Sequence, residues 1–323
     1  IDGKLVGAYA YGFAWQKDQA IIGVTPIESM IDIVENYPPI DPEQRYRRAS
    51  NNVLLAPQAH YPLTGSDEGL SLKFAELAQA TAAEAAGAGK RFPLYVSGIS
   101  DPVLDIFEEQ AAEIGIRWAR VPSATGGSGA EWTERDSLDL RPGMPVAGVL
   151  MSGDFDIAGV GTVTWKDGDR LLGFGHPFFC VFYVEIPMAG ARVITVVRSL
   201  QQSFKLTEVG PVVGSIYQDR LTGIAGEIGR EAPTIEVNYE ITDGAGETTA
   251  YSAELFEHPR MSPLLAAIGL LQSLQTHMDA NDQQTLYLDT RIDVRGHDPI
   301  RIRNVDVDSS GAVRLAIELL RVM

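Results

Sequence analysis

One histidine in this chain stands where a tight backbone turn could hold its ring. His176 follows Gly173 and Gly175 and precedes Pro177 in the stretch LLGFGHPF. Glycine permits a sharp turn and close backbone approach at the end of a strand, and proline fixes the direction of the exit. A histidine held in this way can act as a general base, because its ring stays within reach of a nucleophile. The alternative is a histidine that satisfies buried backbone groups at a turn.

The other polar clusters predict neither a metal site nor a cofactor site. No two of the five histidines stand at metal-ligand spacing, which excludes a zinc site of the common kinds. The acidic residues between 154 and 169 suit solvated turns and lack the twelve-residue calcium-loop pattern. The glycine-rich stretch 126–129 lacks the Lys-Ser/Thr pair of a phosphate-binding loop.

The composition of the chain argues against nucleic acids and membranes as binding partners. The net charge is -17 and the isoelectric point about 4.7, so phosphate backbones and anionic membrane surfaces would be repelled. The single cysteine, Cys180, excludes an internal disulfide. The most apolar run, Pro263–Leu271, is far shorter than the roughly 20 residues of a membrane-spanning helix. No signal peptide is visible, and the chain begins at Ile1, so it could be a mature product or a piece of a longer protein.

The first 123 residues predict a small α/β portion. Thr25, Pro26 and Glu28 have the spacing of a helix start, with Thr25 as the N-cap of a helix that runs to about Val34. A strand–helix–strand order favours a right-handed βαβ unit. The expected strands are Leu5–Phe13, Gln19–Gly23, Val53–Leu55, Phe92–Ser97 and Ile116–Val121, and the other expected helices are Leu72–Ala86 and Asp101–Ile114.

The remainder predicts a β-rich body after a linker at 124–140. Short strands separated by Gly and Asp turns, with a hairpin at Lys166–Asp169, favour a barrel or sandwich over 141–323. Ser262–His277 reads as an apolar helix, and the last expected strands are Thr285–Val294, Ile300–Val307 and Ala312–Leu319. The fold class is therefore α+β, with 1–123 as an N-terminal α/β portion. The alternative is one intertwined domain in which Leu5–Gly23 joins the later sheet.

Three segments resemble one peptidase family. They are Ile157–Trp165 followed by Leu171–Phe178, then Val213–Gly229, and Tyr11–Met30 with its AYGF and GVTPIESM. Together they resemble the SpoIVB-type (stage IV sporulation protein B) serine peptidase domain family, in a divergent envelope-associated branch. The likeness is best over Arg141–Gly229.

The resemblance implies that His176 is the catalytic base. The family supplies its nucleophile in a Gly-Met-Ser-Gly-Ser-Pro stretch, which this chain lacks, and an aspartate before proline about fifteen residues earlier. Here His258 stands at the aspartate position and Ser273 follows at the nucleophile spacing, but Ser273 falls in an apolar helix whose amides are used in helix bonds. The family's order of segments also implies an ion pair of Asp219 and Arg220 beside His176.

We therefore favour a non-catalytic domain of this family, a pseudoenzyme that binds a protein or peptide segment in a bacterial cell-envelope assembly. The alternative is a serine endopeptidase in which His176 is the general base of a divergent nucleophile. The expected location is the cell envelope, the periplasm or the extracellular space. We expect no nucleic-acid partner and no membrane span, and the oligomeric state stays open.

Overall fold

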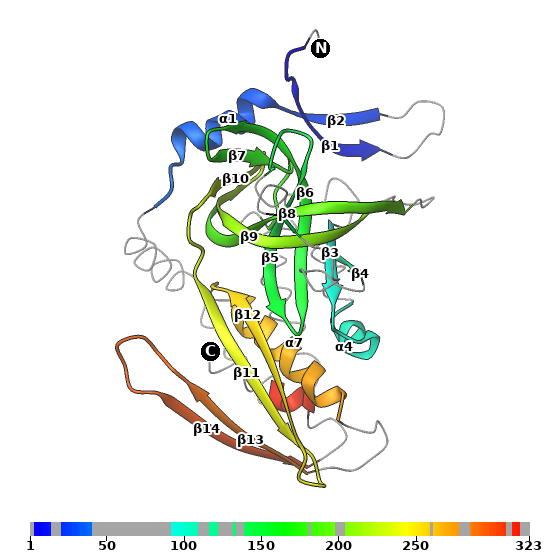
Figure 1. The fold of residues 1–323 in the computed structure, drawn as a ribbon, viewed down its shortest axis with the longest axis vertical. Helices are drawn as coiled ribbons and strands as arrows, with labels where there is room; N and C mark the ends of the chain where they lie inside the picture. Colours follow the sequence, from blue (N-terminus) through cyan, green and yellow to red (C-terminus); the bar gives the residue numbers. More distant parts are fainter. Residues whose placement is uncertain are drawn as a thin grey trace.

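The protein is mostly β-strand, as the sequence predicts (Figure 1). The computed structural model describes residues 3–13, 21–40, 92–108, 116–121, 132–133, 139–179, 182–197, 204–258, 261–277, 285–307 and 312–316. Its strands are β1 (Gly7–Phe13), β2 (Ile21–Pro26), β3 (Phe92–Ser97), β4 (Ile116–Arg120), β5 (Pro145–Gly153), β6 (Asp156–Asp167), β7 (Arg170–Gly173), β8 (Phe182–Val197), β9 (Phe204–Arg220), β10 (Gly223–Ile228), β11 (Thr234–Thr242), β12 (Thr248–Phe256), β13 (Thr285–Ile292) and β14 (Ile300–Val307). Its helices are α1 (Ile27–Asn36), α4 (Asp101–Ile106) and α7 (Met261–Gln275).

Six antiparallel strands close on themselves into a barrel. The ring runs β5–β8–β9–β10–β7–β6, and the pairing of β6 with β5 closes it. Closure removes the free strand edges that an open sheet would expose. The expected β-rich body is therefore confirmed, and its central part is a barrel.

The barrel is filled by side chains and is not a channel. A Cβ built on Gly148 of β5 would meet Phe178, Ile186 and Ile216, so apolar side chains from the surrounding chain converge on that point. All three of these side chains are buried. The glycine leaves the space that the Phe178 ring needs, which brings the turn after β7 into contact with the barrel core.

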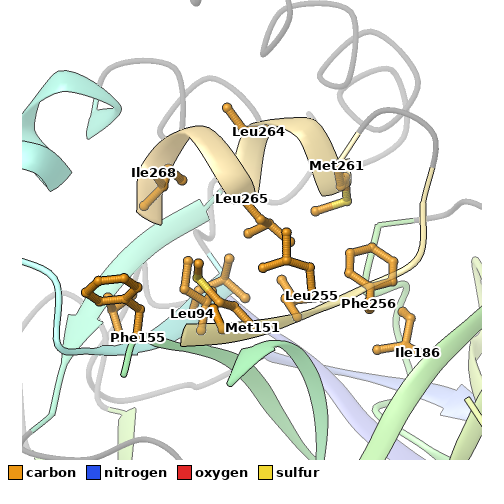
Figure 2. Close-up of a cluster of buried hydrophobic side chains, with 14 of the residues drawn as sticks. Leu94, Met151, Phe155, Ile186, Leu255, Phe256, Met261, Leu264, Leu265 and Ile268 are labelled. Carbon is orange, nitrogen blue, oxygen red and sulfur yellow. The ribbon is translucent and has the colours of Figure 1, made fainter. Parts of the chain in front are cut away.

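A second layer of the core surrounds α7. Every residue from Met261 to Leu274 is buried, which is the pattern of a helix covered on all sides. The helix packs against β11, β12 and α4. Figure 2 shows Leu265 of α7 facing Met151 of β5 and Leu255 of β12. The predicted apolar helix is thus confirmed, and it joins the β11–β12 ribbon to the barrel.

The N-terminal elements attach to the barrel in two places. β3 pairs in parallel with β4 and antiparallel with β6, so the predicted βαβ unit extends the large sheet. β1 and β2 pair with each other in a two-stranded sheet of their own. α1 packs its Met30 and Ile33 against Leu172, Tyr217 and Ala225 on the outside of the barrel. In the described residues, the N-terminal hairpin therefore contacts the body through packing and not through the large sheet.

Local predictions met different outcomes. The hairpin at Lys166–Asp169 is confirmed, because β6 ends at Asp167, β7 begins at Arg170, and Gly168 takes the positive φ of +58° that such a turn needs. The strand expected at Ala312–Leu319 is wrong in its described part, since residues 312–316 are helical. That helix packs its Ala316 into the core around α7.

The N-cap expected at Thr25 is also wrong. Thr25 belongs to β2, α1 begins at Ile27 after Pro26, and no side chain caps its first turn. Several other expectations lie outside the described residues: the strand Val53–Leu55, the helix Leu72–Ala86, the end of the helix Asp101–Ile114, most of the 124–140 linker, and Cys180.

Candidate functional site

The turn that carries His176 joins β7 to β8 in an unusual backbone conformation. Phe174 has a φ of +70°, which non-glycine residues adopt only when their surroundings enforce it, and Gly175 follows with +76°. The Phe174 amide donates to the carbonyl of Thr162 at 3.0 Å, and the Gly175 amide donates to that of Gly173 at 2.8 Å. The turn is therefore fixed by backbone bonds on the side of β6 and β7.

The His176 ring is packed and bonded within the turn. Its Nδ1 lies 2.8 Å from the carbonyl oxygen of Pro177. The ring lies against Phe92 of β3 and Phe174, with centroids 5.6 Å and 5.8 Å away. Because a carbonyl oxygen only accepts, Nδ1 carries the hydrogen of the neutral ring, and Nε2 is left as the basic nitrogen.

Asp219 holds the far side of the turn. Its carboxylate is fully buried and accepts hydrogen bonds from the amides of Phe178 at 2.7 Å and Phe179 at 2.6 Å. The expected position of Asp219 beside the histidine turn is thus confirmed. Arg220 lies over the ring of Tyr37 with its guanidinium carbon 3.3 Å from the ring centroid, and its ion pair with Asp219 stays a prediction.

The N-terminal hairpin closes over the same turn. The Thr25 hydroxyl of β2 donates to the carbonyl of Gly175. A Cβ on Gly175 would overlap Ala8 of β1, so only glycine allows the two backbones to approach this closely. Four apolar side chains of this region stay exposed, with Tyr9 at 63%, and we call them the hairpin patch: Leu5, Val6, Tyr9 and Val24.

The structure does not bring Ser273 and His258 together. Ser273 is completely buried, and its hydroxyl donates to the carbonyl of Gly269 at 2.8 Å within α7. His258 precedes the helix, where its Nδ1 accepts from the amide of Met261 at 3.2 Å. Twelve residues of helix separate Met261 from Ser273, which is roughly 18 Å along the axis. The two residues therefore serve opposite ends of α7, the first as a cap and the second as core.

The serine that follows a glycine in VGSIY is also engaged. The hydroxyl of Ser215 donates to the Glu185 carboxylate at 2.7 Å. Arg230 binds the same carboxylate, with Nη2 at 2.6 Å from Oε1, and also donates to the carbonyl of Ile40 at 3.1 Å. This buried group ties the chain after α1 to the outside of the barrel.

Sequence reasoning missed two distant partners of the turn, Phe92 and Thr25, and it also missed that Asp219 binds the amides of Phe178 and Phe179. Phe92 and Thr25 come from segments far away in the sequence, and neither has a local pattern that indicates its contact with the turn. Within the described residues, no three His, Cys, Asp or Glu side chains gather as a metal site. In the same residues, no helix has the length and apolar character to span a membrane.

Comparisons of the chain with protein-family models, with curated proteins and with solved structures found no match. The likeness to the SpoIVB-type family therefore rests on the segments quoted above.

Proposed function

We propose that this protein is a non-catalytic SpoIVB-peptidase-like module that binds a protein partner in a bacterial cell-envelope assembly. The observation that carries the proposal is the use of polar groups around His176 inside the protein. Asp219 takes the amides of Phe178 and Phe179, Nδ1 faces the Pro177 carbonyl, and Thr25 binds the Gly175 carbonyl. The turn then serves as a joint between the barrel and the N-terminal hairpin.

A serine peptidase would need free backbone amides and a hydroxyl beside its histidine for the reaction. The oxyanion that forms on the substrate requires free backbone amides, and the base requires a hydroxyl within about 3 Å of its ring nitrogen. Beside His176 two amides already donate to a buried carboxylate. The hydroxyls of Ser215 and Ser273 donate to partners inside the fold. Catalysis would require these bonds to be exchanged.

The hairpin patch is the surface we propose for the partner. Leu5, Val6, Tyr9 and Val24 are exposed on one small ribbon, next to a turn that fixes the ribbon in place. Clustered exposed apolar side chains are typical of protein-binding surfaces, and tyrosine is enriched there. A rigid attachment keeps the ordering entropy of binding low.

One observation favours the second candidate, a serine endopeptidase. The contact of Nδ1 with the Pro177 carbonyl leaves Nε2 as the basic nitrogen, which is the tautomer that a general base requires.

Labelling with a fluorophosphonate probe tests the choice between the two. We expect no adduct on the folded wild-type protein, while a known serine hydrolase in the same sample is labelled. An adduct that forms on the wild type and disappears in His176→Ala would establish a histidine-activated serine and replace the non-catalytic proposal. Circular dichroism of both proteins checks that each is folded.

A photo-cross-linking residue at Tyr9 tests the binding surface in cells that produce the protein. The matched control places the same residue at Arg141, an exposed position before β5. We expect a discrete adduct with one protein from Tyr9 and none from Arg141. The absence of an adduct at Tyr9, or equal adducts at both positions, would contradict the patch as the binding site.

A further inference from the structure

The β13–β14 ribbon turns an unusual face to solvent. Its residues alternate between half-buried and exposed, and Leu286 and Leu288 on the inner side pack against the main core. On the outer side Tyr287 is 80% exposed, Val305 53% and Val307 66%. We call this outer side the basic face, and its strand residues are Thr285, Tyr287, Asp289, Arg291, Arg301, Arg303, Val305 and Val307.

The basic face has an apolar end and a cationic end. Tyr287 stands directly opposite Val305 in the antiparallel register. Farther along, Arg291 stands directly opposite Arg301, a like-charge pair that destabilises an isolated ribbon. Arg291 is paired with Asp293 at 2.8 Å, whereas Arg301 has no ion pair within the described residues. This end therefore carries positive charge that the ribbon itself does not neutralise.

The neighbouring β11–β12 ribbon has the opposite character. Its inner side packs on α7, and the residues of its outer side are exposed. Glu236 stands directly opposite Glu254 on that outer side, and Glu240 lies on the same side four residues farther along β11. No lysine or arginine stands on this side in either strand. We call it the acidic face, with the strand residues Thr234, Glu236, Asn238, Glu240, Thr242, Thr248, Ala250, Ser252 and Glu254.

We propose that the basic face of one copy of this protein docks onto the acidic face of a second copy. Each face contains a like-charge cross-strand pair, Arg291–Arg301 on one and Glu236–Glu254 on the other. Docking would set the two arginines against the two glutamates and relieve both repulsions, as complementary charges at interfaces do. The apolar end with Tyr287 supplies the area that such an interface buries.

The dimensions and arrangement suit a second copy. The strands of the basic face have eight residues and those of the acidic face nine, so both ribbons are about 27–30 Å long. Both faces are exposed in the same molecule, so they do not satisfy each other internally. The two ribbons share one end of the molecule (Figure 1), so two copies related by a two-fold axis can exchange both contacts. Self-association of this kind does not depend on the binding role proposed above, since a peptidase could also self-associate.

Sedimentation-equilibrium measurements of the full chain test the proposal. We expect the wild type to associate as its concentration rises. Arg301→Glu and Glu254→Arg should each weaken association by about tenfold or more, because each sets like charges against each other across the interface. The matched controls reverse an exposed charge elsewhere, Arg141→Glu and Glu231→Arg, and should leave association unchanged.

Mixing the two interface variants gives the sharpest result. The Arg301→Glu copy keeps the native acidic face, and the Glu254→Arg copy keeps the native basic face, so each variant alone should associate only weakly. Their mixture should associate more tightly, because the two native faces can meet each other and the two altered faces carry an opposite-charge pair. A wild type that is monomeric at every concentration, association unaffected by both reversals, or a mixture that does not associate would each overturn the proposal.

Discussion

Removing the Asp219 carboxylate should loosen the histidine turn and lower the stability of the whole barrel. The carboxylate is fully buried and accepts two short hydrogen bonds from the amides of Phe178 and Phe179. In Asp219→Ala both amides lose their acceptor, and Phe178 is a side chain that fills the barrel next to Gly148. The change therefore affects the turn and the core together.

The expected loss follows from the two bonds. A hydrogen bond to a charged group contributes about 1.5–3 kcal/mol, so Asp219→Ala should lower the free energy of unfolding by roughly 3–5 kcal/mol. Asp219→Asn keeps one acceptor oxygen and turns an NH2 group toward the other amide, so it should lose about 2 kcal/mol. The matched control is Asp167→Ala, an exposed carboxylate 3.4 Å from Arg170, whose loss should be below about 1 kcal/mol.

Urea unfolding followed by tryptophan fluorescence measures the loss of unfolding free energy in the three variants. Hydrogen exchange measures the protection of the amides in the turn directly. The amides of Phe178 and Phe179 should exchange faster in both Asp219 variants. A loss below about 1 kcal/mol for Asp219→Ala, with unchanged protection of these two amides, would refute the reasoning, because a buried amide left without its acceptor must be destabilising.

Two further predictions concern other buried polar groups. Arg230→Ala leaves the Glu185 carboxylate buried without its guanidinium and should cost about 3–5 kcal/mol in unfolding free energy. Adding Glu185→Gln should recover part of that loss in urea titrations, and a double variant no more stable than the single one would count against a charge effect. Burial raises the pKa of Tyr239, whose hydroxyl donates to the Ala266 carbonyl. Above about pH 10 the unfolded chain releases this phenolic proton while the folded chain keeps it, so stability should fall as the pH rises further. Above about pH 10 the unfolding midpoint should fall less steeply with rising pH in Tyr239→Phe than in the wild type. Equal slopes of midpoint against pH for the two proteins would contradict this reasoning.

Local patterns predicted the elements whose causes are local. Gly168 with its acidic neighbours marks the hairpin between β6 and β7, and the apolar run within Met261–Gln275 marks a buried helix. The parallel pairing of β3 and β4 around α4 follows from their order and from the handedness of such units.

The long strands that close the barrel were not predictable in the same way. β8 runs through Pro187 and Gly190, residues that locally suggest a loop and not the interior of a long strand. Pro187 stands opposite Ser215 of β9, and several register shifts in that ladder accommodate the irregular residues. Pairing partners that lie far away in the sequence thus outweigh local preference.

In the candidate site, too, the features with local causes could be predicted and the long-range contacts could not. The glycines and the proline around His176 indicated a tight turn, and that turn exists. Thr25 illustrates the other case: its spacing fits a helix cap, but its hydroxyl binds the Gly175 carbonyl 150 residues away. A threonine hydroxyl can form a hydrogen bond to a nearby backbone group or to a distant one. The sequence alone does not show which of these two bonds forms.

The position of α1 has a consequence for how the chain is made. The helix comes early in the sequence, and its Met30 and Ile33 pack against Leu172, Tyr217 and Ala225. A ribosome must therefore synthesise almost 200 further residues before the last of this docking surface exists, and the apolar side of α1 stays exposed meanwhile. The barrel also closes late, because β7 pairs with β10, which is synthesised about 50 residues later. Contacts of such long range slow folding, so this protein should depend on chaperones during synthesis more than its composition suggests.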